Sequence, residues 1–79
     1  MRKKVPKMVI SFKSNVSAIA MESLASPDLG RVIPLPAKIS AGCGLAFCGN
    51  PQGEKQIMEV MADNGIEYSG VHIVEMYEI

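Results

Sequence analysis

The stretch RVIPLPAKISAGCGLAFC, residues 31–48, decides how we expect the chain to fold. Arg31–Leu35 and Leu45–Cys48 are short apolar runs that predict two strands, and Pro36–Gly44 is the loop between them. Pro34 has no amide hydrogen to donate to a sheet, so its strand should lie at an edge. The run Leu45–Cys48 contains no charged residue, which is typical of a strand that is buried on both faces.

The residues before this stretch predict one further strand and one helix. Lys7–Phe12 alternates its apolar side chains with a period of two, so we expect a strand there, after a flexible basic lead over residues 1–6. Ser14 should cap a helix that ends before Pro27, because its hydroxyl can accept from the free amides of the first turn. Apolar residues at helical spacing predict the inward side of this helix, namely Val16, Ile19, Ala20 and Leu24.

The residues after it predict a second helix and a last strand. The helix should begin at Gln52 or Gly53 and end at Asn64-Gly65, since glycine readily adopts the left-handed conformation of a helix stop. Its inward side should consist of Ile57, Val60, Met61 and Asn64. Val71–Ile79 should form a strand whose two faces both mix polar and apolar residues. A bulge, a second edge or a face covered by another subunit would each explain this mixture.

The order of these elements is β-α-β-β-α-β, which predicts an α+β, ferredoxin-like fold. In this fold a four-stranded antiparallel sheet carries two helices on one face. Right-handed crossovers fix the spatial order of the strands as 4-1-3-2. The second strand then lies at an edge, as Pro34 requires. With 79 residues, the chain should form a single domain over residues 1–79.

Composition and charge limit the partners that we expect. Lys and Arg together number 8, as do Asp and Glu, so neither a nucleic acid nor an anionic membrane is indicated as a partner. No apolar segment has the length of a signal-peptide core or of a membrane span. Because the chain has two cysteines and no export signal, we expect a reducing, cytoplasmic location.

Cys43 is the candidate functional residue, because a thiol between two glycines has little around it to bury it. In the expected topology the start of the third strand lies beside the end of the first. Cys43 should therefore lie near a lysine and a helix N-terminus, both of which lower the pKa of a thiol. Amides of the glycine-rich segment can add a small anion-binding nest. The residues that we expect to support the thiolate are Lys13, Ser14, Lys38, Gly42 and Gly44.

Four segments carry a resemblance to a known family: Phe12-Lys13-Ser14, Pro34-Leu35-Pro36, Ile39-Ser40 leading to Cys43-Gly44-Leu45-Ala46, and Asn64-Gly65-Ile66. Together they resemble the selenium/sulfur carrier protein-like family of small bacterial domains, over residues 7 to 77. The resemblance marks Ile-Ser-x-x-Cys-Gly as the functional motif. The chain departs from the family pattern at Ala37 and Lys38, where an arginine and a glutamate often stand, and at Gly42, where a serine or aspartate often stands.

Three functions remain open. The first, which the resemblance implies, is a carrier that holds sulfur or selenium on Cys43 as a persulfide or selenopersulfide. Its donor would be a cysteine desulfurase-like protein or a selenium-handling enzyme. We expect a carrier rather than a stand-alone enzyme, since no general base is visible near the thiol. The second is a ferredoxin-like binding or regulatory module that forms a homodimer or binds a small ligand or protein. The third is a thiol redox partner that forms a reversible disulfide through Cys43.

The remaining candidate residues are expected to be structural. On one extended strand Cys48 would lie ~16 Å from Cys43, beyond the reach of a disulfide, so we expect it to be a core residue. His72 is the only histidine, and one histidine with two separated cysteines does not make a zinc site. We therefore expect neither a metal nor a cofactor.

Overall fold

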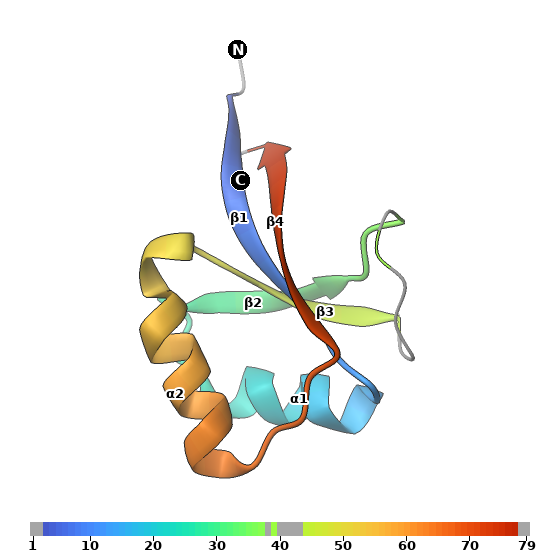
Figure 1. Ribbon diagram of the computed structural model, residues 1–79, viewed down its shortest axis with the longest axis vertical. Helices are drawn as coiled ribbons and strands as arrows, with labels where there is room; N and C mark the ends of the chain where they lie inside the picture. The colour runs from blue at the N-terminus through green and yellow to red at the C-terminus, as the bar shows by residue number, and fades with distance from the viewer. Residues whose placement is uncertain (1–2, 38, 40–43, 78–79) are drawn as a thin grey trace.

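A computed structural model describes residues 3–37, 39 and 44–77 and confirms the ferredoxin-like fold (Figure 1). Its elements are β1 (Lys4–Ser11), α1 (Asn15–Leu24), β2 (Gly30–Pro34), β3 (Leu45–Gly49), a 3-10 turn (Pro51–Gly53), α2 (Glu54–Asn64) and β4 (Gly70–Tyr77). The four strands form one antiparallel sheet in the order β2-β3-β1-β4. β2, which contains Pro34, lies at an edge as predicted.

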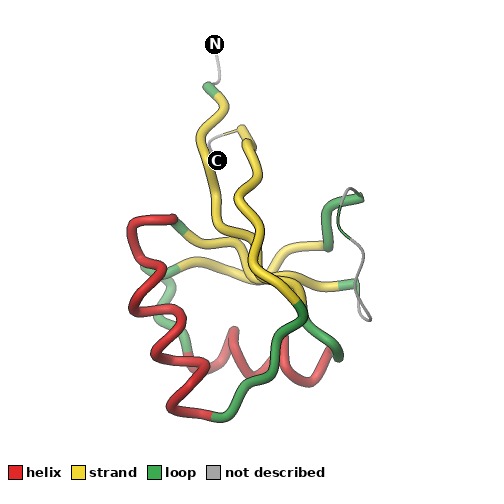
Figure 2. Tube along the Cα trace, viewed as in Figure 1, coloured by secondary structure: helices red, strands yellow, loops and turns green. Residues whose placement is uncertain are grey.

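Both helices lie on the same side of the strands (Figure 2). The main core fills the layer between the helices and the sheet. Its buried residues are Met8, Ile10, Phe12, Ala18, Met21, Phe47, Ile57 and Met61. Burial of each of the larger side chains among them contributes ~1.5–3 kcal/mol to the free energy of unfolding. The opposite, open face of the sheet carries a smaller buried cluster of Val9, Ile39 and Ala46.

β1 begins at Lys4 rather than at Lys7, so part of the expected basic lead belongs to the sheet. Lys4–Pro6 pair with Glu75–Tyr77 of β4. β3 first meets β1 at Met8, so this early part of β1 has a strand on one side only, where a proline is tolerated. The paired ends of β1 and β4 project beyond the rest of the sheet (Figure 1). The prediction missed these residues because their pairing partner lies at the other end of the chain.

The inward side of α1 differs from the prediction. Val16, Ile19 and Leu24 are 76%, 56% and 47% exposed, whereas Ala18 and Met21 are fully buried. The apolar side chains of this helix lie on most sides of it, so helical spacing alone does not select the side that faces the sheet. The small Ala18 lets the helix approach the sheet closely, and the adaptable Met21 side chain joins the core.

The second helix follows the prediction more closely. Ile57 and Met61 are buried and Val60 packs against the core. Asn64 is exposed instead of inward, and its side-chain amide donates to the Val60 carbonyl over 2.8 Å. Gly65 ends the helix with φ 65°, in the left-handed region, as expected of a glycine stop.

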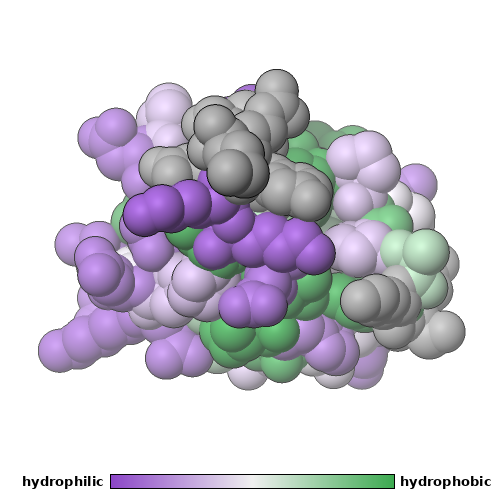
Figure 3. Space-filling view, turned by 90° about the horizontal axis from the view of Figure 1, so that it is seen from above, coloured by the Kyte–Doolittle hydropathy of each residue, from purple (hydrophilic) through white to green (hydrophobic). Residues whose placement is uncertain are grey.

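β4 is the second edge of the sheet. Its 8 residues pair continuously with β1, so no bulge explains its mixed faces. Ile73 is 61% exposed on the helix-covered side, beyond the main core. Seen from the end where β1 and β4 project, apolar surface is interrupted by hydrophilic surface (Figure 3). No helix in the described part of the chain is long and apolar enough to cross a membrane.

Candidate functional site

The predicted site residues that the structure describes lie at the same end of the sheet. In the β1–β3 ladder Ser11 lies opposite Ala46. The strands are antiparallel, so the residues after Ser11 and those before Ala46 leave the sheet at the same end (Figure 1). This places Lys13 and Ser14 at the same end of the sheet as Gly44. Three further residues of the predicted site, Lys38, Gly42 and Cys43, lie outside the described residues.

Ser14 caps α1, as predicted. It has φ −147° and ψ 157°, and its Oγ accepts from the Ser17 amide at 3.4 Å. Its hydroxyl is therefore engaged with its own helix. The amides of Asn15 and Val16 have no acceptor within an α-helix, and the first turn contains no acidic residue. The positive end of the α1 dipole is thus open to an anion from outside the helix.

Gly44 is held in place but not covered. Its carbonyl accepts from the Leu35 amide at 2.8 Å, which continues the pairing of β2 with β3 by one step. Gly44 is exposed, and a Cβ built on it would have no atom within 4 Å. Another molecule can therefore approach the backbone here from solvent.

Ile39 connects the same loop to the open face of the sheet. It is 8% exposed and clusters with Val9 and Ala46. Its amide donates to the Pro36 carbonyl at 3.0 Å. This packing role of Ile39 was not predicted, although a β-branched residue among small and polar neighbours is a usable signal.

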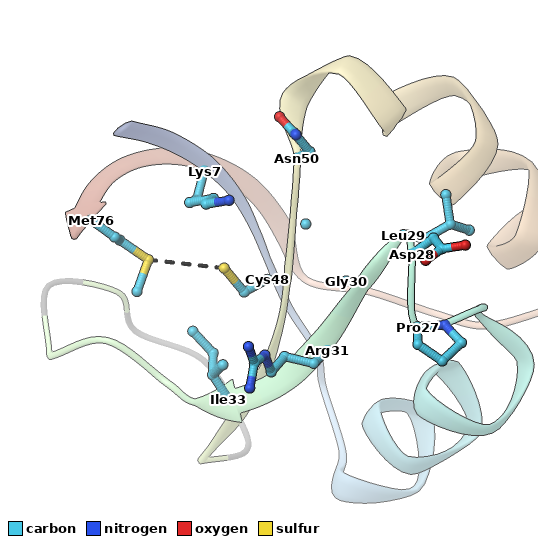
Figure 4. Close-up of a pocket in the computed structure, with 11 residues that line it drawn as sticks. Lys7, Pro27, Asp28, Leu29, Gly30, Arg31, Ile33, Cys48, Asn50 and Met76 are labelled. Carbon is cyan, nitrogen blue, oxygen red and sulfur yellow. Dashed lines mark hydrogen bonds between the residues drawn. The ribbon is translucent and has the colours of Figure 1, made fainter. Parts of the chain in front are cut away.

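Cys48 does not lie in the main core, contrary to the prediction. It is half-buried and lines a cavity of about 230 Å³ on the open face (Figure 4). Successive side chains of a strand point to opposite faces, so Phe47 enters the helix-covered core and Cys48 faces the side without helices. Its Sγ lies 4.0 Å from the Met76 Sδ, to which it can donate weakly.

Two cations lie near this thiol. Arg31 is directly opposite Cys48 in the β2–β3 ladder, and Lys7 comes from β1. Burial raises the pKa of the Cys48 thiol above its ordinary value of 9.0, while the positive charges of Lys7 and Arg31 lower it by less. At neutral pH the thiol is therefore protonated.

The close approach of β2 to Cys48 depends on a glycine. Gly30 has φ 153°, which side-chain-bearing residues rarely adopt. A Cβ at this position would overlap the carbonyl oxygen of Cys48. Gly30 thus lets β2, which carries Arg31 and forms one wall of the cavity, lie close to β3.

His72 is half-buried on the open face, in register with Val9. Among the described residues, no group of three or more His, Cys, Asp or Glu side chains is arranged to hold a metal ion.

Comparison with known proteins places the chain in a family. The family model described as "Putative Se/S carrier protein-like" matches residues 7–73, from within β1 to within β4. The chain therefore belongs to this family. No curated protein and no solved structure matches it.

Proposed function

We propose that this member of the Se/S carrier protein-like family carries sulfur or selenium on Cys43, as a persulfide or selenopersulfide. The supporting observation is that Lys13, the open N-terminus of α1 and the uncovered Gly44 lie at the same end of the sheet. Cys43 directly precedes Gly44, and neighbouring Cα atoms are ~3.8 Å apart. The residue that carries the thiol is thus the neighbour of Gly44 in the sequence.

In the loading step, the Cys43 thiolate attacks the outer sulfur of a persulfide on a donor protein. The donor's sulfur–sulfur bond breaks, a sulfur–sulfur bond forms on Cys43, and the donor leaves as a thiolate. This exchange needs no added oxidant or reductant. An acceptor thiolate removes the outer sulfur by the same exchange, and selenium takes the place of the outer sulfur in the selenopersulfide.

The surroundings of Gly44 suit both partners of such an exchange. A terminal persulfide is anionic, and Lys13 with the positive end of α1 would stabilise that charge. The open space at Gly44 would admit a thiol from another protein. A cysteine desulfurase-like protein or a selenium-handling enzyme is the donor class that this chemistry calls for.

The test is intact-mass analysis after incubation with a cysteine desulfurase and cysteine. We expect the chain to gain the mass of one sulfur atom, and to lose it again on treatment with a reducing thiol. The Cys43→Ser variant should gain no sulfur, whereas the Cys48→Ser variant should gain it as the unchanged chain does. Equal labelling of the Cys43→Ser variant would contradict the proposal.

Lys13→Gln provides a second test. Losing one positive charge near the thiolate should slow loading by roughly twofold to fivefold, as expected of an exposed lysine whose charge is screened by solvent. Lys55, an exposed residue of α2, supplies the matched control Lys55→Gln, which should load at the original rate.

A further inference from the structure

The cavity beside Cys48 is separate from the end of the sheet that holds Gly44. Gly44 precedes the first residue of β3, whereas Cys48 is the last but one, so about 13 Å of extended chain separates their Cα atoms. Figure 4 shows Lys7, Arg31, Cys48, Asn50 and Met76 around the cavity, which also reaches Gly30. Nothing in the carrier chemistry proposed for Cys43 uses these residues.

The charge of the cavity wall is the observation that matters most. Lys7 and Arg31 come from different strands and lie on either side of the Cys48 sulfur (Figure 4). Within the described part of the chain, neither cation forms an ion pair with a carboxylate. Asp28 is the one carboxylate among the lining residues, and it lies beyond Gly30 (Figure 4). The end of the cavity near Cys48 therefore carries two uncompensated positive charges.

This charge decides between two kinds of occupant. The sulfur atoms of Cys48 and Met76 would suit a soft cation such as Cu(I), but two ligands are few and the neighbouring cations would repel it. An anion would instead be attracted by both charges. The protonated thiol does not compete with it for them, since burial raises the pKa of Cys48.

The volume of the cavity limits the size of the anion that can bind. The cavity of about 230 Å³ is smaller than the ~300 Å³ at which sites for drug-sized ligands begin. It is several times larger than the ~30 Å³ that a water molecule occupies. A small oxyanion with some of its water fits this space. Guanidinium and ammonium groups are well suited to holding oxyanions, and Arg31 and Lys7 supply one of each.

We propose that this cavity is a binding site for a small divalent oxyanion of the phosphate, sulfate or thiosulfate type. Lys7 and Arg31 bind its oxygen atoms from two sides. The Cys48 thiol lies between these two cations, so its rate of alkylation reports whether the site holds an anion.

The first test compares two alkylating reagents in a Cys43→Ser background, where Cys48 is the remaining cysteine. Iodoacetate is anionic and iodoacetamide is neutral, and each loses iodide to the thiolate. The rate of iodoacetate relative to iodoacetamide should fall by roughly threefold in Lys7→Gln and in Arg31→Gln, because each removes one attracting charge. Lys55→Gln, which removes a charge away from the cavity, should leave the ratio unchanged, and Lys7→Arg should preserve it.

The second test is protection of Cys48 from iodoacetamide at constant ionic strength. Phosphate at ten times its dissociation constant should slow alkylation by about tenfold, by mass action, and chloride should not. Protection by both phosphate and thiosulfate supports a general oxyanion site, and protection by thiosulfate alone supports one for sulfur oxyanions.

An unchanged reagent ratio in both Lys7→Gln and Arg31→Gln would overturn the proposal, as would equal protection by chloride. Denaturant midpoints of the variants separate loss of binding from loss of folding. Both tests use Cys43→Ser, so they are independent of sulfur loading on Cys43.

Discussion

The two faces of the sheet differ in which side chains they carry. The face under the helices holds the large side chains of the main core, such as Phe47 and Met8, with no exposed surface. The open face holds a smaller cluster around Val9 and Ala46, and beside it the half-buried Cys48 with its cations. One face thus supplies most of the folding free energy, and the other is left free to carry polar and reactive groups.

This division explains how so short a chain accommodates the Cys48 thiol next to its core. The strand β3 sends Phe47 into the core and Cys48 to the opposite face. The Cys48 thiol is therefore placed where its chemistry does not disturb the core, and stability and the reactivity of Cys48 can be changed separately.

The largest effect is expected from Phe47→Ala. Removing a fully buried aromatic ring should lower the free energy of unfolding by about 3–5 kcal/mol, through lost burial and the cavity left behind. Urea unfolding measures this value. Val16→Ala, on the exposed side of α1, should change it by less than ~0.5 kcal/mol. A large loss in Val16→Ala would show that our assignment of the inward side of α1 is wrong.

A smaller effect is expected on the open face from Ile39→Ala. Ile39 is buried against only a few residues, so the loss should lie near the lower end for such substitutions, about 2 kcal/mol. Ile39→Val removes one methylene group and should cost ~1 kcal/mol. If Ile39→Ala cost as much as Phe47→Ala, the two faces would contribute equally and the contrast between them would fail.

Ser14→Ala should have a smaller effect again. Loss of the cap leaves a first-turn amide of α1 without its side-chain acceptor, at a cost of about 1 kcal/mol. Ser23→Ala is the matched control, since the Ser23 Oγ donates to the Ile19 carbonyl within the helix and replacement by alanine should be neutral or slightly stabilising. Equal losses in both variants would argue against the capping role.

The smallest change is a shift in the pH dependence of Cys48 alkylation. In a Cys43→Ser background, the rate with iodoacetamide should reach half its maximum above pH 9.0, since burial disfavours the thiolate. Lys7→Gln should move the midpoint higher still, because a charge that stabilises the thiolate is lost. A midpoint below 9.0 in the unchanged chain would mean that the two cations outweigh burial.

The topology was predictable because local signals agreed with one another. Pro34 demanded an edge, Ser14 and Gly65 marked helix ends, and the element order left a single simple arrangement. The inward side of α1 was not predictable, since Val16 and Ile19 are as apolar as the residues that are buried. Tertiary contacts, rather than helical spacing, select among them.

The candidate site was predictable only in part. The meeting of Lys13, Ser14 and Gly44 follows from strand order alone. The cavity at Cys48 depends on the register that sets Arg31 opposite it, and register cannot be read from such short strands. Cys43, Gly42 and Lys38 lie outside the described residues, so their part of the site stays a prediction.

β1, one of the two inner strands of the sheet, also governs when the chain can fold during synthesis. β1 emerges from the ribosome before the other three strands, yet Lys4–Ser11 must pair with Gly70–Tyr77, the last strand in the sequence. Contacts between residues so far apart slow folding, because the long intervening segment must first be ordered. We therefore expect a nascent chain stalled before Gly70 to remain sensitive to proteases, and the sheet to close only after Gly70–Tyr77 has left the ribosome.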